Sequence, residues 1–309
     1  MSSSIVRVNN LSHRYSVQWA IKDINLEFAN KGIYGLLGAN GAGKSTIMNI
    51  MCGVLKQSQG DVFIKDINLR EDPVAAKKHL GFLPQRPPLQ MDLTVEEFLI
   101  HCANLRLMKS SEVRAAVKEV MGRCQISHFA KRLIRNLSGG YQQRVGIAQA
   151  IIHKPDFVVL DEPTNGLDPN QILEMRGLIK GIAEEHTVVL STHILQEVQM
   201  LCDNIWMINE GKMVFSGAME EFDNYIMPST LVVSLMAPPS LEELQTIPGV
   251  VRVEDIGGTK FRLHFSDAQE VIERLVETSV SRNWRLLEIG VEKNSLETIF
   301  SELTQKKSN

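Results

Sequence analysis

The N-terminal two thirds of the chain combines short apolar runs with segments of helical spacing. Residues 24–28 alternate apolar and polar side chains, a period of two that predicts a half-buried strand. Residues 157–160 and 187–190 are short apolar runs, and residues 172–185 between them have a helical pattern. A strand, a helix and a second strand in this order predict a parallel α/β core.

Helical patterns dominate the stretch from about residue 85 to residue 153. Thr94 and Glu97 have the spacing of a capping box, and apolar residues follow them at helical intervals. The two apolar stripes are Val95, Phe98, Leu99 and Cys102, and then Val113, Ala116, Val117, Val120 and Met121. We interpret the stripes as packing faces, and the whole stretch as a helical lobe inserted into the α/β core.

The pattern changes near Pro228. Strands are predicted at residues 231–235, 250–254, 260–265 and 284–289, and helices at residues 241–245 and 268–277. This order, βαββαβ, predicts a small α+β domain of the ferredoxin-like type, with an added helix at residues 296–303. We therefore expect two domains, residues 1–227 and residues 228–309.

Length and composition agree with two globular domains and exclude several classes of protein. A chain of 309 residues with 44% hydrophobic and 22% charged residues should bury a substantial core. The net charge, 33 − 36 = −3, gives no reason to expect a nucleic-acid partner. Four scattered cysteines predict a reducing compartment, and without a targeting segment or an apolar run of membrane-spanning length the chain is expected to be soluble.

Residues 38–45 read Gly-Ala-Asn-Gly-Ala-Gly-Lys-Ser and fit the phosphate-binding pattern G-x-x-x-x-G-K-[ST]. A glycine-rich turn could fit by chance, but residues 33–37 before it and 46–51 after it have the patterns of the required strand and helix. Lys44 would bridge the outer phosphates of a nucleotide, and Ser45 would hold Mg²⁺. The predicted nucleotide-binding residues here are Gly38, Ala39, Asn40, Gly41, Ala42, Gly43, Lys44, Ser45 and Thr46.

Two carboxylates follow the apolar run at residues 157–160. Asp161 and Glu162 would stand at the C-terminal end of a buried strand, where α/β sheets bind ligands. An acidic strand end alone is most often a solvated turn, but a phosphate-binding loop upstream reverses that preference. We expect Asp161 to hold Mg²⁺ through water and Glu162 to act as the general base.

A second anion site is predicted at Ser138, Gly139 and Gly140, which precede the helical residues 143–152. A hydroxyl and bare backbone amides at a helix start attract anions, although such a segment alone is more often an ordinary N-cap or loop. One nucleotide seldom requires two such sites in one chain. The full set of motifs, in their order, favours the anion site.

These motifs together resemble those of the ATP-binding cassette (ABC) subunits of transporters, over about residues 5–217. Gln85 stands at the Q-loop position, residues 137–144 at the signature, residues 166–168 at the D-loop and residues 191–193 at the H-loop. The fold expected from this resemblance is α/β, a P-loop ABC-type ATPase domain with the inserted helical subdomain.

The resemblance implies roles for individual residues. Tyr15 would stack on adenine, Gln85 would contact Mg²⁺ or the attacking water, and His193 would sense the γ-phosphate, with Asp168 as the D-loop aspartate. Without the resemblance, Tyr15 could simply cover an edge strand, Gln85 would be a loop residue, and His193 would be an ordinary histidine. Ser138 and Gly140 would bind the γ-phosphate held by an opposite subunit, and Tyr141, where the commonest signature has Gln, is expected to alter rate or partner specificity.

The resemblance also implies partners. We expect ATP and Mg²⁺ as cofactors, a second copy of this chain or a similar ATPase subunit, and separate transmembrane permease subunits at the inner face of the cell membrane. Residues 295–300 resemble the tail of ATPase subunits in ABC-2-type exporters, so export is expected, and the C-terminal domain is a dimer-stabilising appendage or a regulatory, ligand-sensing domain. The alternatives are a soluble ABC-type ATPase of translation or DNA repair, and a non-hydrolysing nucleotide-binding regulator.

Overall fold

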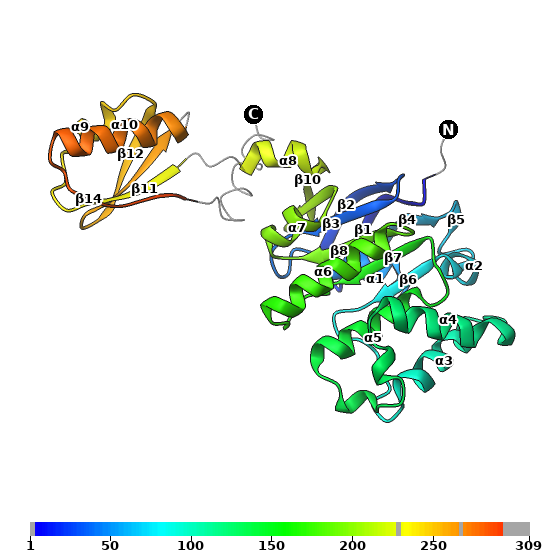
Figure 1. The fold of residues 1–309 in the computed structure, drawn as a ribbon. Helices are drawn as coiled ribbons and strands as arrows, with labels where there is room; N and C mark the ends of the chain where they lie inside the picture. Colours follow the sequence, from blue (N-terminus) through cyan, green and yellow to red (C-terminus); the bar gives the residue numbers. More distant parts are fainter. Residues whose placement is uncertain (1–3, 227–229, 266–267, 293–309) are drawn as a thin grey trace. The chain divides into compact units, whose positions relative to one another are not determined.

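The computed structural model describes residues 4–226, 230–265 and 268–292 (Figure 1). The chain divides into two compact units, Met1–Met219 and Glu220–Asn309. Helix α8 (Met219–Ile226) begins at the last residue of the first unit and continues into the second. No helix among the described residues is both long and apolar enough to span a bilayer.

The first unit is built on a six-stranded sheet with the order β10-β9-β3-β8-β7-β6. All neighbouring strands pair in parallel except β9 and β10, which form an antiparallel pair. The strands are β3 (Gly32–Leu37), β6 (Leu80–Leu83), β7 (Phe157–Asp161), β8 (Thr187–Thr192), β9 (Asn204–Asn209) and β10 (Lys212–Ala218). The parallel core predicted from the apolar runs is confirmed, because parallel strands that are buried on both faces read as continuous apolar sequence.

A smaller antiparallel sheet with the order β2-β1-β4-β5 covers part of the main sheet. Its strands are β1 (Val6–Tyr15), β2 (Gln18–Phe28), β4 (Gln59–Ile64) and β5 (Ile67–Asn68). The strand predicted at residues 24–28 is the second half of β2. Phe28 joins the two sheets, since its ring centre lies 5.0 Å from that of Phe157 and 4.4 Å from that of Trp206.

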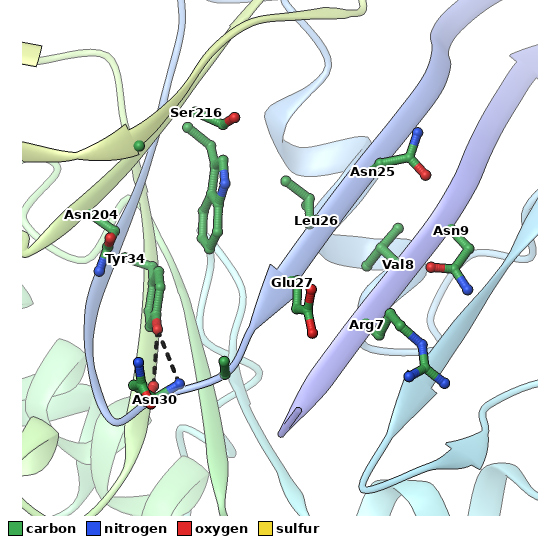
Figure 2. Close-up of a pocket in the computed structure, with 13 residues that line it drawn as sticks. Arg7, Val8, Asn9, Asn25, Leu26, Glu27, Asn30, Tyr34, Asn204 and Ser216 are labelled. Atoms are coloured by element: carbon green, nitrogen blue, oxygen red, sulfur yellow. Dashed lines mark hydrogen bonds between the residues drawn. The ribbon is translucent and has the colours of Figure 1, made fainter. Parts of the chain in front are cut away.

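The two sheets leave a polar cavity of about 510 Å³ where β2 faces β9 and β10 (Figure 2). Arg7, Glu27 and Asn204 line it, and the ring of Tyr34 stacks on Trp206 at 4.9 Å. The hydroxyl of Tyr34 donates a hydrogen bond to the carbonyl oxygen of Asn30 at 3.0 Å. Because Tyr34 stands near the start of β3, this cavity lies at the opposite end of that strand from residues 38–45.

Helices of the first unit follow strands of the main sheet, follow the last strand of the smaller sheet, or lie in one insertion. Those that follow strands are α1 (Lys44–Met51), α2 (Pro73–Lys78), α6 (Pro169–Ala183) and α7 (Leu195–Leu201). The insertion joins β6 to β7 and contains α3 (Val95–Leu105), α4 (Ser110–Arg123), the 3₁₀ turns Ser127–Phe129 and Ile134–Asn136, and α5 (Gly139–Ile151). In Figure 1 helices α3, α4 and α5 gather on one side of the main sheet.

The predicted helical patterns of this insertion are confirmed. Thr94 accepts a hydrogen bond from the backbone of Glu97, whose side chain reaches back to the N–H of Thr94. All five residues of the second apolar stripe are buried on α4, while Cys102 of the first stripe is only partly buried.

The second unit holds a four-stranded antiparallel sheet with the order β12-β13-β11-β14. Its elements are β11 (Thr230–Leu235), α9 (Leu241–Gln245), β12 (Val250–Gly257), β13 (Lys260–Phe265), α10 (Ala268–Ser281) and β14 (Leu286–Val291). One face of the sheet packs on the helices through Val233, Leu263, Leu244 and Leu275. The order of elements along the chain is the predicted one.

The bounds of the last two elements differ from those predicted. Helix α10 continues to Ser281, beyond residue 277, and the last strand begins at Leu286, two residues later than expected. Asn283 and Arg285 both have left-handed backbone conformations, with φ of 57° and 55°, so the chain turns there before the strand begins. Trp284, which appeared to start the strand, is a core residue of this turn. The helix predicted at residues 296–303 lies outside the described residues.

Candidate functional site

The loop between β3 and α1 is shaped by its glycines. Gly43 has a φ of 110°, and a Cβ atom there would lie 2.6 Å from Cγ2 of Ile21. A Cβ atom at Gly38 would lie 2.6 Å from the carbonyl oxygen of Ile208. Gly43 is also the N-cap of α1, and no side chain in the described part of the chain caps this helix. The first turn of α1 therefore presents backbone N–H groups that suit an anion.

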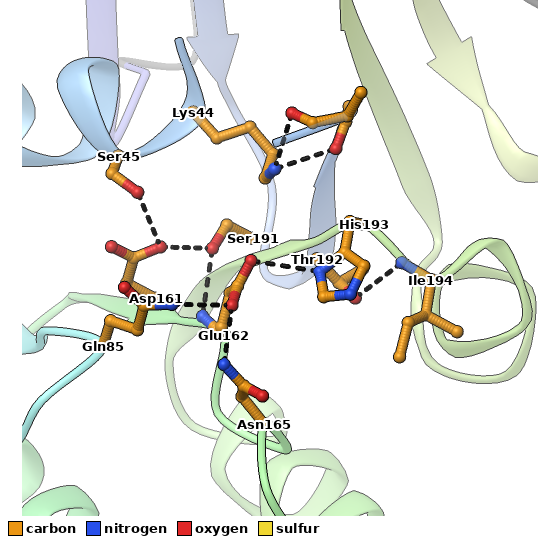
Figure 3. Close-up of polar contacts among 12 residues, drawn as sticks. Lys44, Ser45, Gln85, Asp161, Glu162, Asn165, Ser191, Thr192, His193 and Ile194 are labelled. Carbon is orange, nitrogen blue, oxygen red and sulfur yellow. Dashed lines mark hydrogen bonds and ion pairs between the residues drawn. The ribbon is translucent and has the colours of Figure 1, made fainter. Parts of the chain in front are cut away.

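Lys44, the first residue of α1, is buried against this loop. Its Nζ donates hydrogen bonds to the carbonyl oxygens of Gly38 at 2.8 Å and Ala39 at 3.2 Å (Figure 3). Burial lowers the pKa of Lys44, while the nearby carboxylates of Glu162 and Asp161 act in the opposite direction. The loop thus holds a cation beside the N-terminus of α1, which is the arrangement that phosphate oxygens require.

Asp161, at the end of β7, joins three segments of the chain. The hydroxyl of Ser191, on β8, donates to Oδ1 of Asp161 at 2.5 Å and accepts from the backbone N–H of Glu162 at 3.0 Å. The hydroxyl of Ser45 donates to the same carboxylate oxygen at 3.4 Å. Carboxylate and hydroxyl oxygens are ligands that Mg²⁺ prefers. The carboxylate of Asp161 and the hydroxyl of Ser45 come from segments far apart in the sequence. The residues present therefore fit a magnesium ion.

Glu162 is held in a fixed orientation from three sides (Figure 3). Its Oε2 accepts hydrogen bonds from the side-chain amides of Gln85 at 2.9 Å and Asn165 at 3.0 Å, and Nδ1 of His193 lies 3.1 Å from its Oε1. The backbone of Glu162 is left-handed, with a φ of 49°. A residue without glycine's freedom keeps such a conformation only where its surroundings enforce it, and such strain gathers at functional sites.

Ser138, Gly139 and Gly140 form the start of α5, in the inserted helices. Ser138 is the exposed N-cap residue, and its side chain makes no capping hydrogen bond. A Cβ atom at Gly140 would lie 2.8 Å from Oε1 of Gln171, so α5 packs closely on α6 there. Among the described residues, no hydrogen bond or ion pair joins this segment to Lys44, Asp161 or Glu162. The structure therefore presents two separate sets of candidate anion-binding groups.

Asp168 and Tyr15 have no hydrogen bond or ion pair to Lys44, Asp161 or Glu162 among the residues that the structure describes. Oδ1 of Asp168 accepts from the backbone N–H of Gln171 at 3.0 Å and caps α6, next to the start of α5. Tyr15 ends β1 and is 53% exposed, with its ring edge-on to His13 at 4.7 Å. An exposed aromatic face is what stacking on a nucleobase requires.

Tyr141 takes part in an aromatic cluster. Its ring centre lies 4.6 Å from that of Phe129 and 5.8 Å from that of His128, and the guanidinium of Arg144 lies 5.9 Å from it. The ring therefore packs within its own subdomain and braces the first turn of α5.

Several residues of the site were not predicted from the sequence. Asn165 has no motif of its own, and Ser191 was noted only as part of the segment before His193. Glu197, whose carboxylate accepts from the hydroxyls of Thr164 and Thr192, was not noticed at all. A buried glutamate on a helix gives no signal in sequence, because its pattern matches that of a solvated helix face.

The strand–loop–helix around Lys44, the paired carboxylates after β7 and the glycine segment before α5 define a P-loop nucleotide-binding domain of the ABC type. The family model described as "ABC transporter" matches residues 21–165. The bacitracin transport ATP-binding protein BcrA of Bacillus licheniformis is 35% identical over 214 residues, which are 69% of this chain and 69% of that protein.

Two further similarities extend the comparison. The linearmycin resistance ATP-binding protein LnrL of Bacillus subtilis is 27% identical over 308 residues, 97% of this chain and 98% of that protein. A solved dimeric structure of a post-hydrolysis state of the ATP-binding cassette MJ0796, bound to ADP and Pi, matches with a TM-score of 0.62 and 26% identity, over 69% of this chain and 98% of that chain. This chain belongs to the family of ABC transporter ATP-binding proteins. The names of its relatives do not favour a soluble ATPase of translation or DNA repair.

Proposed function

We propose that this chain hydrolyses ATP as one half of a pair and that the pair powers export through separate membrane subunits at the inner face of the cell membrane. Two ATP·Mg²⁺ would lie between the P-loop of one chain and the Ser138–Gly140 segment of the other. The second chain is a further copy or a similar ATPase subunit. The observation that carries the proposal is the orientation of Glu162 by Gln85, Asn165 and His193, beside Lys44 and Asp161.

The geometry of these side chains supports hydrolysis by the following steps. The N–H groups of α1 and the ammonium of Lys44 would hold the β- and γ-phosphates, and Ser45 and Asp161 would hold Mg²⁺. Bound Mg²⁺ neutralises charge that develops on the phosphate oxygens. Glu162 would accept a proton from water as the water oxygen attacks the γ-phosphorus, and the bond to the β-phosphate oxygen breaks to leave ADP and phosphate.

The other predicted residues would support this step. Gln85 and His193 hold the carboxylate of Glu162 toward the attacking water, and His193 is also placed to sense the γ-phosphate. Tyr15 would stack on adenine. Asp168 and the Ser138–Gly140 segment, which lie side by side through Gln171, would meet the partner chain and its γ-phosphate together.

We further propose the two-domain division, an ABC-type domain at residues 1–227 with its helical subdomain at about residues 85–153, and a ferredoxin-like domain at residues 228–309. The βαββαβ order and the strand order β12-β13-β11-β14, with all neighbours antiparallel, support the second assignment. A dimer-stabilising role and a regulatory or ligand-sensing role both fit a domain that follows the ATPase domain.

Cofractionation tests the coupling to membrane subunits. The tagged chain should be recovered in the membrane fraction when its permease subunits are coexpressed, and not in cells that lack them. Recovery on ribosomes or DNA, with no membrane protein in the eluate, would contradict the transporter assignment. ATP hydrolysis by the purified chain, compared with that of the Glu162→Gln variant, tests the enzymatic part separately.

A further inference from the structure

Glu197 is a buried carboxylate that touches neither of the candidate anion sites. It lies on α7 and is 3% exposed. Its Oε1 accepts a hydrogen bond from the hydroxyl of Thr164 at 2.5 Å, and its Oε2 accepts one from the hydroxyl of Thr192 at 2.6 Å. One carboxylate therefore connects two loops that have no sequence proximity.

The two loops are those that carry Glu162 and His193. Thr164 stands two residues after Glu162, and Thr192 stands immediately before His193. The hydroxyl of Thr192 also accepts from the backbone N–H of Ile194 at 3.0 Å, so the turn at His193 is fixed on both sides (Figure 3). The contact between Nδ1 of His193 and Oε1 of Glu162 at 3.1 Å connects the same two loops a second time.

Stability alone does not explain a carboxylate at this position. Among the described residues, Glu197 forms no ion pair, and burying a carboxylate without a cationic partner is unfavourable, because water solvates the charge better than two hydroxyl groups do. An apolar side chain packed on α7 would avoid that cost. Glu162 needs such support, because its left-handed backbone conformation persists only where neighbouring groups enforce it.

We propose that Glu197 is a positioning residue for hydrolysis, which holds the loop of His193 and the loop of Glu162 in one arrangement. The inference rests on the proposed ATPase activity. Glu197 acts through Thr164 and Thr192 and does not contact the nucleotide or the attacking water. Its carboxylate suits this role because it can accept from both hydroxyls at once, whereas an amide offers only one oxygen.

The central test is Glu197→Gln in the full chain with ATP·Mg²⁺. The turnover number should fall by about 10- to 100-fold, the effect of misplacing a catalytic group by about 1 Å. Nucleotide affinity should stay within about twofold of the unaltered chain, because Lys44 and Ser45 are untouched. Thr164→Val and Thr192→Val should lower turnover in the same way, while Thr164→Ser and Thr192→Ser, which keep the donor, should restore it.

Two further arms separate positioning from general destabilisation. Val198→Ala removes a fully buried neighbour on the same helix, so it should lower the melting temperature while turnover by the folded protein stays unchanged. In a Glu162→Gln background, Glu197→Gln should cause no further loss of turnover, because residues that act as one unit are not additive. Additive losses, or unchanged turnover in Glu197→Gln, would overturn the proposal.

A crystal structure of Glu197→Gln supplies a readout that does not depend on turnover. The separation of His193 Nδ1 and Glu162 Oε1 should rise beyond about 3.5 Å, the limit of a hydrogen bond. An unchanged contact would refute the positioning role even if the chain proved not to hydrolyse ATP. Absence of hydrolysis by the unaltered chain would instead refute the proposed function.

Discussion

The surroundings of Glu162 and the segment Ser138–Gly140 are both candidate phosphate sites, but they are built in opposite ways. Around Glu162, the described polar side chains are joined to one another within the chain, as in the contacts to Gln85 and His193. At the start of α5, the hydroxyl of Ser138 is exposed and makes no capping bond. The first arrangement is oriented before any ligand arrives, and the second leaves its donors available.

This difference indicates how the work is divided. A catalytic group gains from being fixed in advance, because no rearrangement is then required as charge develops. A surface that must meet a partner chain gains from free donors at a helix start, which an incoming anion can satisfy. The contrast supports a paired arrangement in which the chain completes its neighbour's site.

Among the variants of the site around Glu162, Lys44→Ala should lower ATP turnover most. Removing the cation leaves the β- and γ-phosphate charge uncompensated, so ATP turnover should fall by about 10³-fold or more. Lys77→Ala is the matched control, because Nζ of Lys77 also donates to a backbone carbonyl, that of Gly53 at 3.0 Å, beyond the far end of α1. Normal steady-state hydrolysis by both variants would show that residues 38–45 are not the phosphate-binding loop.

Glu162→Gln should remove the base while keeping the shape of the side chain. Turnover should fall by about 10²- to 10⁴-fold, the usual contribution of general-base assistance, and ATP binding should survive. In the proposed pair unhydrolysed ATP would bridge the two chains, so a dimer should accumulate with ATP·Mg²⁺ in size-exclusion chromatography. A monomeric variant with full activity would show that Glu162 is not the base.

Ser138→Arg, added to Glu162→Gln, tests whether the Ser138–Gly140 segment contacts a nucleotide held by a partner chain. A long side chain at the start of α5 would obstruct the facing γ-phosphate, so the trapped dimer should dissociate while each monomer still binds ATP. Ser110→Arg is the matched control, since Ser110 is an exposed serine at the start of α4 in the same insertion. A dimer indifferent to Ser138→Arg would contradict the shared site.

The fold was predictable where side-chain pattern and burial coincide. The buried parallel strands β7 and β8 read as continuous apolar runs, and the stripe of α4 has the period of a helix packed on one face. The last strand was misplaced because Trp284 is apolar and buried but belongs to a turn. Left-handed backbone at Asn283 and Arg285 sets that turn; asparagine often adopts this conformation at the end of a helix, whereas arginine gives no such signal.

The site was predictable only as far as its motifs are continuous in sequence. Residues 38–46 and Asp161 with Glu162 are adjacent residues whose chemistry is explicit. Asn165 contacts Glu162 within the same turn but belongs to no motif, and Glu197 depends on a contact with a separate loop, so both roles follow from the fold. Whether Ser138 and Gly140 meet a nucleotide held by another chain stays a prediction.

Acidification should weaken the attachment of α5 to the main sheet at His153, just after the C-terminal end of this helix. Nε2 of His153 donates to the carbonyl oxygen of Leu80 at 3.0 Å, while its buried Nδ1 has no hydrogen-bond partner among the residues that the structure describes. Burial, followed by the charge of Arg106, lowers the pKa of His153 to about 4, from an ordinary 6.5. Between these values the unfolded chain binds more protons, so the free energy of unfolding decreases as the pH falls.

The size of this effect can be measured by urea denaturation. From pH 7.5 to pH 5.5 the contribution of His153 to the free energy of unfolding should fall by about 1 kcal/mol. His153→Gln keeps an amide donor and does not titrate, so the loss between the two pH values should be smaller by that amount. An identical loss in both proteins would show that His153 is not held neutral by burial.

The smallest effect is expected on the free energy of unfolding when either of two neighbouring glycines, Gly139 or Gly140, is replaced. A Cβ atom at Gly140 would meet the side-chain amide of Gln171 at 2.8 Å, whereas one at Gly139 would meet no atom of the described residues within 4 Å. Gly140→Ala should therefore lower the free energy of unfolding by about 1 kcal/mol, as overpacking does. Gly139→Ala should raise it by about 0.5 kcal/mol, because alanine favours the helix. Equal shifts in urea denaturation would mean that the side chain of Gln171 moves aside and that its contact with Gly140 contributes little to the packing of α5 on α6.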